Sequence, residues 1–387
     1  MRVAPEPTDR GMVVPSPLGW QPIPARPRKA WRWIFGVVGL LVAGVIALNS
    51  VTVGYYAIYP GEAIPVDGVR GTVTVNTLHA GSGNLFLTTV TFRSRVTVWD
   101  QLFNFAHPDV QLIAQRDLTG GVSASQYLAQ NAQAMNDSEL AAKVAALRRL
   151  GYVVPERGDG ALVLQVGPGS AADGRLKEGD VITRIDGRAV AVAGDATAAV
   201  RAHKPGDTIS LDVQRPGLNG SRPGPVHIAV QPTACGSRCP GDPNRALIGI
   251  DLATDQQRFD LPTQVGLNIE ASNIGGPSAG LAFTLGIIDA LTTHAITGGH
   301  RIAVTGTIDP DGTVGPVGGV RQKTVAVEQQ RCEYFLVPTD EFAAATARAK
   351  GSHVKVVSVA NLDQALAFLR SIHGDLSGIP AQSTPAP

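Results

Sequence analysis

The longest apolar run of the chain lies near its N-terminus and carries no charge from Trp33 to Tyr59. About 20 apolar residues cross the hydrocarbon core of a bilayer. Aromatic residues flank the run as an interfacial belt does: Trp31, Trp33, Tyr55, Tyr56 and Tyr59. A cleaved signal peptide is the alternative, but the preceding segment is long, the run exceeds a usual signal core and the cleavage signal is weak. The pattern therefore favours a membrane anchor over residues 31–54.

Charge orients this anchor. Residues 1–32 hold six basic and two acidic residues, a balance of +4, so the net +1 of the chain leaves −3 for the remainder. A basic flank stays in the cytoplasm. This places the N-terminus on the cytoplasmic side of the plasma membrane and the later domains on the outer side. Residues 1–30, rich in Pro and Arg, are predicted to be a disordered tail. No clustered basic surface follows, so nucleic acid is not expected as a partner.

Residues 55–148 show weaker patterns and no chemical motif. Short β-like runs occur at 71–75 and 84–92. Apolar residues at spacings of three and four then predict a helix over 138–150, with Ser138 as its N-cap. We interpret the whole stretch as an extracytoplasmic N-terminal or linker region.

A compact β-rich block over residues 149–232 contains Gly-Ser-Ala-Ala at 169–172, Leu-Lys-Glu-Gly-Asp-Val-Ile at 176–182 and Ile-Asp-Gly at 185–187. This block resembles a PDZ domain, a module that takes an extended peptide as an added strand. The resemblance implies a loop whose N–H groups hold a terminal carboxylate. Four residues are assigned to that loop, with an ordinary turn into a strand as the alternative: Leu150, Gly151, Tyr152 and Val153.

A Pro/Gly-rich stretch at 232–243 is predicted to be the linker to a final domain. That domain alternates strand and helix patterns. Strands are predicted at 264–270, 301–308, 334–337 and 353–359, and helices at 278–291, 319–330, 341–349 and 362–372. These elements predict an α+β domain over residues 245–373. Residues 374–387 are predicted to be a disordered tail.

Ser278 begins the first of these helices, directly after Gly276-Pro277. Proline suits a first helical position, and the unpaired N–H groups of a helix start suit an oxyanion. Ser278 heads the apolar face that also carries Leu281 and Leu285. Taken alone, a serine at this position is more often a helix cap than a nucleophile.

Lys323 changes this balance, because it shares one helix face with Val320, Thr324 and Val327. Lysine is rarely buried in an apolar stripe. Its stem could be buried while the ammonium reaches water. Alternatively, desolvation lowers its pKa and makes it a base able to accept the proton of a serine.

Two motifs carry a second resemblance: Gly276-Pro-Ser-Ala-Gly280, and Thr305-Gly-Thr-Ile with the later Gly-Pro-Val-Gly-Gly-Val-Arg-Gln-Lys323. Over residues 264–372 the chain is similar to the proteolytic domain of Lon proteases. The resemblance implies that Ser278 is the nucleophile, Lys323 its base and Thr305 a contact of the lysine, with Gly276 and Ala279 supporting the turn. Family members often carry an acidic residue where this chain has Gly275.

The order of anchor, PDZ block and Lon-like domain resembles the membrane-anchored PDZ Lon-like proteases of bacteria. No Gly-x-x-x-x-Gly-Lys-Ser/Thr string occurs in the chain, so we expect no ATP-driven motor and no cofactor. The expected fold is a multi-domain chain with a single N-terminal transmembrane helix, a β-rich PDZ domain and a C-terminal α+β Lon-type proteolytic domain.

The three cysteines fit an oxidising compartment. Cys235 and Cys239 lie four apart in a loop-like segment, where a disulfide is the leading interpretation. Zinc is the alternative, but no second Cys/His pair at finger spacing is present, so no metal is expected. Cys332 is expected to be a buried thiol.

The sequence thus predicts an ATP-independent serine endopeptidase with a Ser278–Lys323 dyad, acting outside the plasma membrane on protein or peptide substrates held by the PDZ domain. The alternative is a non-catalytic, membrane-tethered PDZ adaptor. Lon-like domains form rings, so a homo-oligomer, a hexamer by analogy, is a further expectation. A trypsin-like PDZ protease is excluded because the Gly-Asn-Ser-Gly-Gly type of loop is absent.

Overall fold

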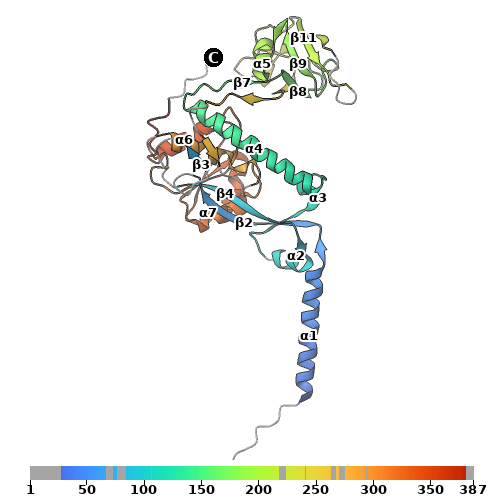
Figure 1. The fold of residues 1–387 in the computed structure, drawn as a ribbon, viewed down its shortest axis with the longest axis vertical. Coiled ribbons are helices and arrows are strands. Elements are labelled where there is room, and N and C mark those ends of the chain that lie inside the picture. The colour runs from blue at the N-terminus through green and yellow to red at the C-terminus, as the bar shows by residue number, and fades with distance from the viewer. Residues whose placement is uncertain are drawn as a thin grey trace, which may run out of the picture.

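The computed structural model describes residues 28–66, 73–75, 84–105, 107–217, 224–239, 241–262, 267–269, 275–292 and 295–380. Its N-terminal helix α1 (Arg28–Ser50) projects alone from the rest of the molecule, as Figure 1 shows at the bottom. Residues 33–50 of α1 are long and apolar enough to cross a membrane, and none of them is buried. The predicted disordered tail differs at its end, since residues 28–30 already belong to α1; residues 1–27 lie outside the described residues.

The central element is a six-stranded sheet of order β22-β21-β18-β4-β2-β6. Its strands are β2 (Tyr55–Pro65), β4 (Leu85–Arg93), β6 (Gln111–Ala114), β18 (Ile302–Val304), β21 (Tyr334–Pro338) and β22 (Lys355–Val359). β4, β18, β21 and β22 are parallel, whereas β2 is antiparallel to both of its neighbours. The prediction of residues 55–148 as a separate region is therefore wrong, because three of these strands complete the sheet of the C-terminal domain.

Helices cover both faces of this sheet. Leu85 and Leu87 point to a core shared with α4, α6 and α9, whereas Phe86 between them points to a core with α7 and α8. This alternation follows from the two-residue period of a strand. The helices are α4 (Ala124–Arg149), α6 (Gly280–Leu291), α7 (Val320–Gln329), α8 (Phe342–Ala349) and α9 (Leu362–Ser371). The helix patterns of the C-terminal domain are thereby confirmed.

Helix α4 is one helix and not the short one expected. It begins fourteen residues before Ser138, because Ser123 and Gln126 form a capping box at its start. Ser138 therefore lies in mid-helix, buried at 5% exposure, and is not an N-cap.

Smaller elements complete this body. They are β1 (Thr52–Val53) paired with β5 (Val96–Thr97), β3 (Val73–Val75) paired with β17 (Leu267–Ile269), β19 (Thr307–Ile308) paired with β20 (Val314–Gly315), α2 (Val98–Phe105) and α3 (Gln115–Thr119). The predicted strand at 264–270 is observed at its centre, while residues 264–266 and 270 lie outside the described residues.

A second sheet of order β12-β11-β9-β8-β15 forms the separate upper lobe in Figure 1. Its strands are β8 (Ala161–Val166), β9 (Val181–Ile185), β11 (Ile209–Gln214), β12 (Val226–Val230) and β15 (Ile250–Thr254), with β10 (Arg188–Ala189) on β9. Helix α5 (Ala193–Arg201) packs against β8 and β15. The lobe therefore extends to residue 254, beyond the boundary at 232 that the sequence predicted.

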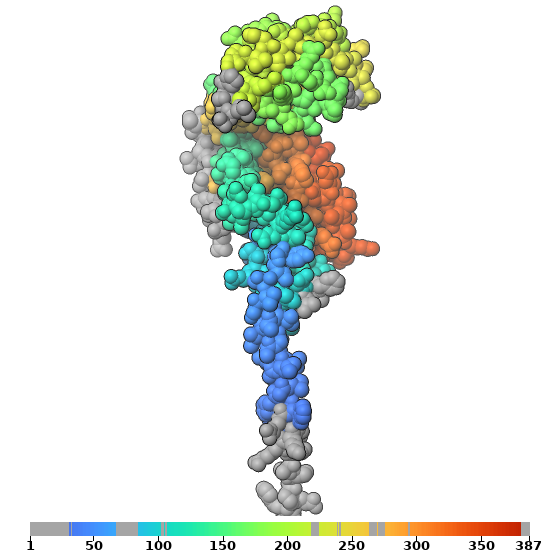
Figure 2. All heavy atoms as spheres, turned by 90° about the vertical axis from the view of Figure 1, so that its right-hand side faces the viewer, coloured from blue at the N-terminus to red at the C-terminus, as the bar shows by residue number. Residues whose placement is uncertain are grey.

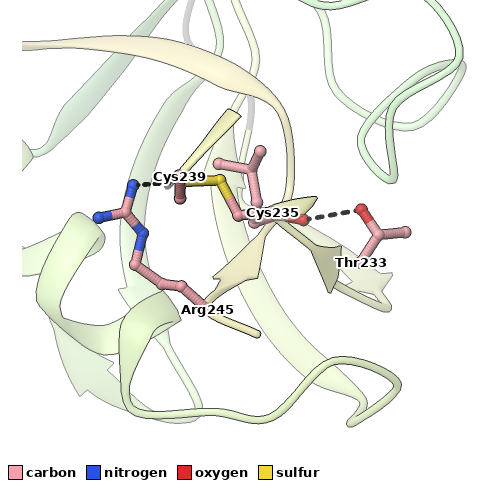
Figure 3. The surroundings of a disulfide bond; sticks show 5 residues. Thr233, Cys235, Cys239 and Arg245 are labelled. Atoms are coloured by element: carbon pink, nitrogen blue, oxygen red, sulfur yellow. Dashed lines mark hydrogen bonds between the residues drawn. A yellow bond between two sulfur atoms is a disulfide. The ribbon is translucent and has the colours of Figure 1, made fainter. Parts of the chain in front are cut away.

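The segment of 233–247 belongs to this lobe and is not an interdomain linker. Its strands β13 (Thr233–Ala234) and β14 (Ala246–Leu247) pair, and a disulfide joins Cys235 to Cys239 between them. Figure 3 shows the Arg245 side chain reaching Cys239, whose sulfur accepts a hydrogen bond from Arg245 Nη2 at 2.8 Å.

The upper lobe joins the body through two strands that leave and re-enter it, β7 (Glu156–Arg157) and β16 (Arg258–Phe259). We call this antiparallel pair the neck. The lobe is thus inserted between α4 and β17 of the body, and Figure 2 shows it above the body, with α1 at the opposite end. The prediction that the proteolytic domain starts at residue 245 is therefore wrong, because residues 250–254 belong to the sheet of the upper lobe.

The predicted C-terminal tail also differs. Leu376 and Ile379 are 7% exposed and belong to the main core, and Pro380 O accepts a hydrogen bond from Arg149 Nη1. Residues 374–380 are therefore packed on the body, while residues 381–387 lie outside the described residues.

Candidate active site

Ser278 lies in a single 3-10 turn, Pro277–Ala279, that leads directly into α6. The preceding Gly276 has φ 87° and ψ 156°, a backbone conformation that only glycine adopts readily. This glycine turns the chain so that Ser278 begins the helix with a partly buried side chain. Ser278 Oγ makes no hydrogen bond within the described residues and caps no helix N–H, so the interpretation of Ser278 as a simple cap is not supported.

Lys323 lies in the first turns of α7, on the other face of the central sheet, and its side chain is 2% exposed. The ammonium therefore does not reach water, and the alternative of a snorkelling lysine is wrong. Burial lowers the pKa of Lys323 from 10.5 to about 7, because desolvation disfavours the charged form. The carboxylate of Glu341 opposes this effect and raises the pKa.

Thr305 connects the two residues at the carboxyl end of β18. Lys323 Nζ donates a hydrogen bond to Thr305 Oγ1 at 3.0 Å, and Thr305 Oγ1 donates to the carbonyl of Ser278 at 3.2 Å. Gly306 N donates to the same carbonyl at 3.0 Å. Helices from opposite faces of the sheet therefore meet beyond the end of one strand, and Ser278, Thr305 and Lys323 form one connected group.

Helix α4 holds the serine turn from the other side. Ser138 Oγ donates a hydrogen bond to the carbonyl of Pro277 at 2.9 Å. Gly280 is required here, since a Cβ at that position would lie 2.7 Å from Ser138 Oγ and 2.8 Å from Ile308 Cγ2. Sequence reasoning assigned Ser138 to a cap, because a contact between residues 138 and 277 leaves no local pattern.

Glu341 is a second residue that the sequence did not single out. Its Oε1 accepts a hydrogen bond from Val317 N at 3.1 Å, and its buried Oε2 has no hydrogen-bond partner within the described residues. Glu341 lies at the start of α8, which packs against α7. Its charge therefore acts on the lysine across the helix pair.

A cavity of about 530 Å³ opens beside the serine turn. Its walls come from the turn itself through Pro277, from α4 through Ser138, from β19 through Thr307, and from the neck through Gln257 and Phe259. The cavity is large enough for substrate side chains, and the inserted lobe contributes one of its walls.

The four residues assigned to a carboxylate-binding loop lie at the end of α4 and directly after it, and that role stays a prediction. Leu150 is the C-cap of α4, Gly151 has φ 88°, and Tyr152 N donates to Leu147 O, which together form the end of that helix. Val153 is 83% exposed. Among the described residues the lobe sheet has two edge strands, β12 and β15, and residues 150–153 pair with neither.

No group of three or more His, Cys, Asp or Glu side chains within the described residues is placed to hold a metal ion. Cys332 is buried, as expected, and burial raises the pKa of its thiol to about 12. Neither Cys332 nor the disulfide adjoins Ser278 or Lys323 through a described hydrogen bond. The chemistry available at the candidate site is therefore that of a hydroxyl, a desolvated amine and backbone N–H groups.

Comparison with known proteins identifies both lobes. Residues 148–222 match the PDZ domain, and residues 259–369 match the Lon protease (S16) C-terminal proteolytic domain. The chain is 42% identical over 65 residues to a Lon protease of Metamycoplasma arthritidis, covering 17% of this chain and 8% of that protein. It is 32% identical over 93 residues to Lon protease 2 of Bacillus subtilis, covering 24% and 16%.

A third relative shares more of the chain. A probable periplasmic serine endoprotease DegP-like of Pseudomonas fulva is 32% identical over 152 residues, or 37% of this chain and 31% of that protein. Among solved structures, the PDZ domain of the SdrC-like protein from Listeria innocua is 26% identical, covers 24% of this chain and 93% of that chain, and has a TM-score of 0.21. This chain spans less than a third of each of these three curated relatives.

The chain thus combines a PDZ domain with a proteolytic domain of the serine-protease class. In domain composition it is similar to a PDZ-containing Lon-like serine protease.

Proposed function

We propose that the protein is a membrane-anchored, ATP-independent endopeptidase that cleaves protein substrates with a Ser278–Lys323 dyad. The observation that carries this proposal is the burial of Lys323 next to Thr305, which in turn is bonded to Ser278. A lysine with a pKa of about 7 is substantially neutral at physiological pH, so it can act as a base.

The hydrogen bonds leave the amine free for this role. Lys323 Nζ donates one N–H to Thr305, whose own O–H is donated to the Ser278 carbonyl. The lone pair of a neutral amine is then available to accept the proton of Ser278 Oγ. Ser278 Oγ attacks the scissile carbonyl carbon as that proton moves to Lys323 Nζ, and backbone N–H groups at the start of α6 stabilise the oxyanion.

The tetrahedral intermediate collapses when the Lys323 ammonium gives its proton to the leaving amine, which breaks the C–N bond and leaves an ester on Ser278. Water, deprotonated by the same neutral lysine, then attacks the ester carbonyl, and the lysine returns that proton to Ser278 Oγ as the C–O bond breaks and the second product leaves. Both half-reactions use one base in two protonation states, which suits a pKa near neutrality.

The PDZ lobe is proposed to hold an extended substrate segment as an added strand on β15. This strand is one of the two edge strands of its sheet within the described residues, the other being β12, and it lies against α5. Substrates must arrive unfolded or flexible, since no phosphate-binding motif of a motor occurs in the sequence.

The test is proteolysis of an unstructured protein by the full-length chain in detergent, comparing wild type with Ser278→Ala and Lys323→Ala. Exposed residues of the same domain supply matched controls, Ser371→Ala and Lys350→Ala. We expect both dyad variants to lose activity and both controls to keep it. Cleavage by either dyad variant contradicts the proposed mechanism. A wild-type protein without proteolytic activity favours the alternative of a non-catalytic PDZ adaptor.

The pH dependence gives an independent readout. Because the base must be neutral, the rate is expected to rise with pH through about 7, the pKa of Lys323, and then to level off. A rate that is flat from pH 6 to pH 8 contradicts a titrating lysine base.

A further inference from the structure

A second cavity, of about 700 Å³, lies where α1 meets the body. It is lined by residues from the last turn of α1, from β2 and from the end of β4 with the turn that follows, among them Asn49, Tyr59, Phe92, Arg93, Ser94 and Arg95. None of these residues belongs to the candidate active site, and no matched domain covers them.

The position of this cavity relative to the end of α1 is fixed by hydrogen bonds. Thr97 Oγ1 lies 3.3 Å from Asn49 Oδ1, Val98 N donates to Val51 O at 3.0 Å, and β1 pairs with β5. The 18 residues of the apolar segment rise about 27 Å at about 1.5 Å per residue, close to the roughly 30 Å of a hydrocarbon core. If α1 spans a bilayer, the cavity lies in its headgroup layer, about 5–8 Å deep on each side.

The charges of the cavity suit a phosphate. Arg93 forms an ion pair with Asp100 at 3.5 Å, and its side chain is still 56% exposed. The other oxygen of Asp100 accepts hydrogen bonds from Thr97 N and Thr97 Oγ1, so this carboxylate also caps α2. Arg95 is exposed, and its guanidinium has no hydrogen bond or ion pair within the described residues. Two arginines therefore line the cavity with one carboxylate, Asp100, that already accepts hydrogen bonds, and guanidinium matches phosphate geometry.

Exposed aromatic side chains occur on the elements that supply the lining residues. Phe92 is 50% exposed, Trp99 on α2 is 42% exposed, and Tyr55 at the start of β2 is 37% exposed. Aromatic residues gather where a protein meets the bilayer interface, because their rings are apolar with a polar end. Such rings have no role in binding a free anion from water, so they favour a lipid as the source of the phosphate.

We propose that this cavity binds the phosphodiester headgroup of an anionic phospholipid, held by Arg93 and Arg95. The proposal rests on the proposed membrane anchoring by α1 and is independent of the dyad. β2 and β4 run from this cavity into the central sheet, so a bound headgroup fixes the orientation of the proteolytic body over the membrane.

The test reconstitutes the full-length protein in nanodiscs of equal phosphatidylcholine and phosphatidylglycerol and counts the lipids retained after mild release by native mass spectrometry. Arg93→Gln/Arg95→Gln is compared with wild type and with Arg184→Gln/Arg201→Gln, two exposed arginines of the PDZ lobe. We expect wild type and the lobe variant to retain the anionic lipid roughly tenfold over the zwitterionic one, and the cavity variant to lose this preference.

Equal anionic preference in all three proteins, or none in wild type, overturns the proposal. Displacement of the lipid by millimolar inorganic phosphate contradicts the assignment of the ligand as a lipid, since the cavity then binds free phosphate. If the full-length protein does not insert into the nanodiscs, both the lipid-binding proposal and the proposed membrane anchoring by α1 are wrong. Single Arg95→Gln, which breaks no bond within the protein's described residues, serves as the second variant if the double one misfolds.

The same samples separate this proposal from the proposed protease. Ser278→Ala in nanodiscs is expected to keep the full lipid preference while losing proteolysis. Arg93→Gln/Arg95→Gln in detergent is expected to keep wild-type proteolysis, which also shows that it is folded.

Discussion

Replacing Lys323 by methionine is expected to stabilise the proteolytic domain while abolishing its activity. Methionine keeps an unbranched apolar stem of similar length and removes the amine. In the folded protein, burial lowers the pKa of Lys323 from 10.5 to about 7. Each pKa unit corresponds to about 1.4 kcal/mol, so holding this lysine in the fold costs about 5 kcal/mol at and below neutral pH. Loss of the bond to Thr305 offsets about 1 kcal/mol of the gain.

The size of this effect depends on pH. The folded-state pKa lies below the unfolded one, so between pH 7 and pH 10.5 the unfolded chain binds one more proton than the folded chain. The stability of wild type therefore rises with pH across this window, whereas below it the cost of Lys323 is constant and at its maximum. The methionine variant lacks this cost, so its advantage is largest at and below pH 7 and nearly vanishes by pH 10.5.

Hydrogen exchange measured by mass spectrometry is the assay, because it reports the opening free energy of α6 and α7 without requiring the whole chain to unfold as one unit. The comparison is made in the Ser278→Ala background, which prevents self-cleavage, with Arg321→Met on the exposed face of α7 as the control. A Lys323→Met protein that is less stable at pH 7, or a gain that does not change with pH, refutes the reasoning.

Three further predictions test the surroundings of the dyad. Thr305→Val removes the hydroxyl between Lys323 and Ser278, and we expect kcat to fall by up to about 100-fold with little change in KM, measured in steady-state proteolysis. Glu341→Gln removes the charge that raises the pKa of Lys323, so the midpoint of the pH–rate profile is expected to move to lower pH; a move to higher pH contradicts the assignment. Gly280→Ala places a methyl group against Ser138 Oγ and Ile308 and is expected to destabilise the fold by about 1–3 kcal/mol in thermal unfolding. Ser138→Ala in the same chain is expected to restore part of this loss, and no restoration contradicts the contact.

The lysine was predictable from the sequence because helix periodicity is local. Lys323 shares a face with Val320 and Val327 within two turns, and burial of that face necessarily takes the lysine with it. The serine was less certain, since the same residue type serves as a cap or a nucleophile. What separates the two is the set of bonds that Thr305 and Gly306 make to its carbonyl, and these come from another strand.

The domain boundaries were not predictable in the same way. β4 pairs with β18, which places Leu85 opposite Ile302 across more than two hundred positions of sequence. The sequence pattern of neither strand predicts its pairing partner, because such a pattern specifies which face is buried and not which strand lies beside it. Residues 55–148 therefore read as a separate region, although their strands carry half of the central sheet.

The insertion of the PDZ lobe bears directly on how substrate binding reaches the active site. A linker of the kind predicted at 232–243 lets two domains move independently. The structure instead joins them through the neck, whose Phe259 packs with Leu140 and Val154 at the side of α4. The edge strand β15 ends at Thr254, and Gln257, three residues later, already lines the cavity beside Pro277. A peptide added to β15 thus lies a few residues from a wall of the serine turn, so any displacement of that strand is expected to change the cavity before it changes any other part of the body.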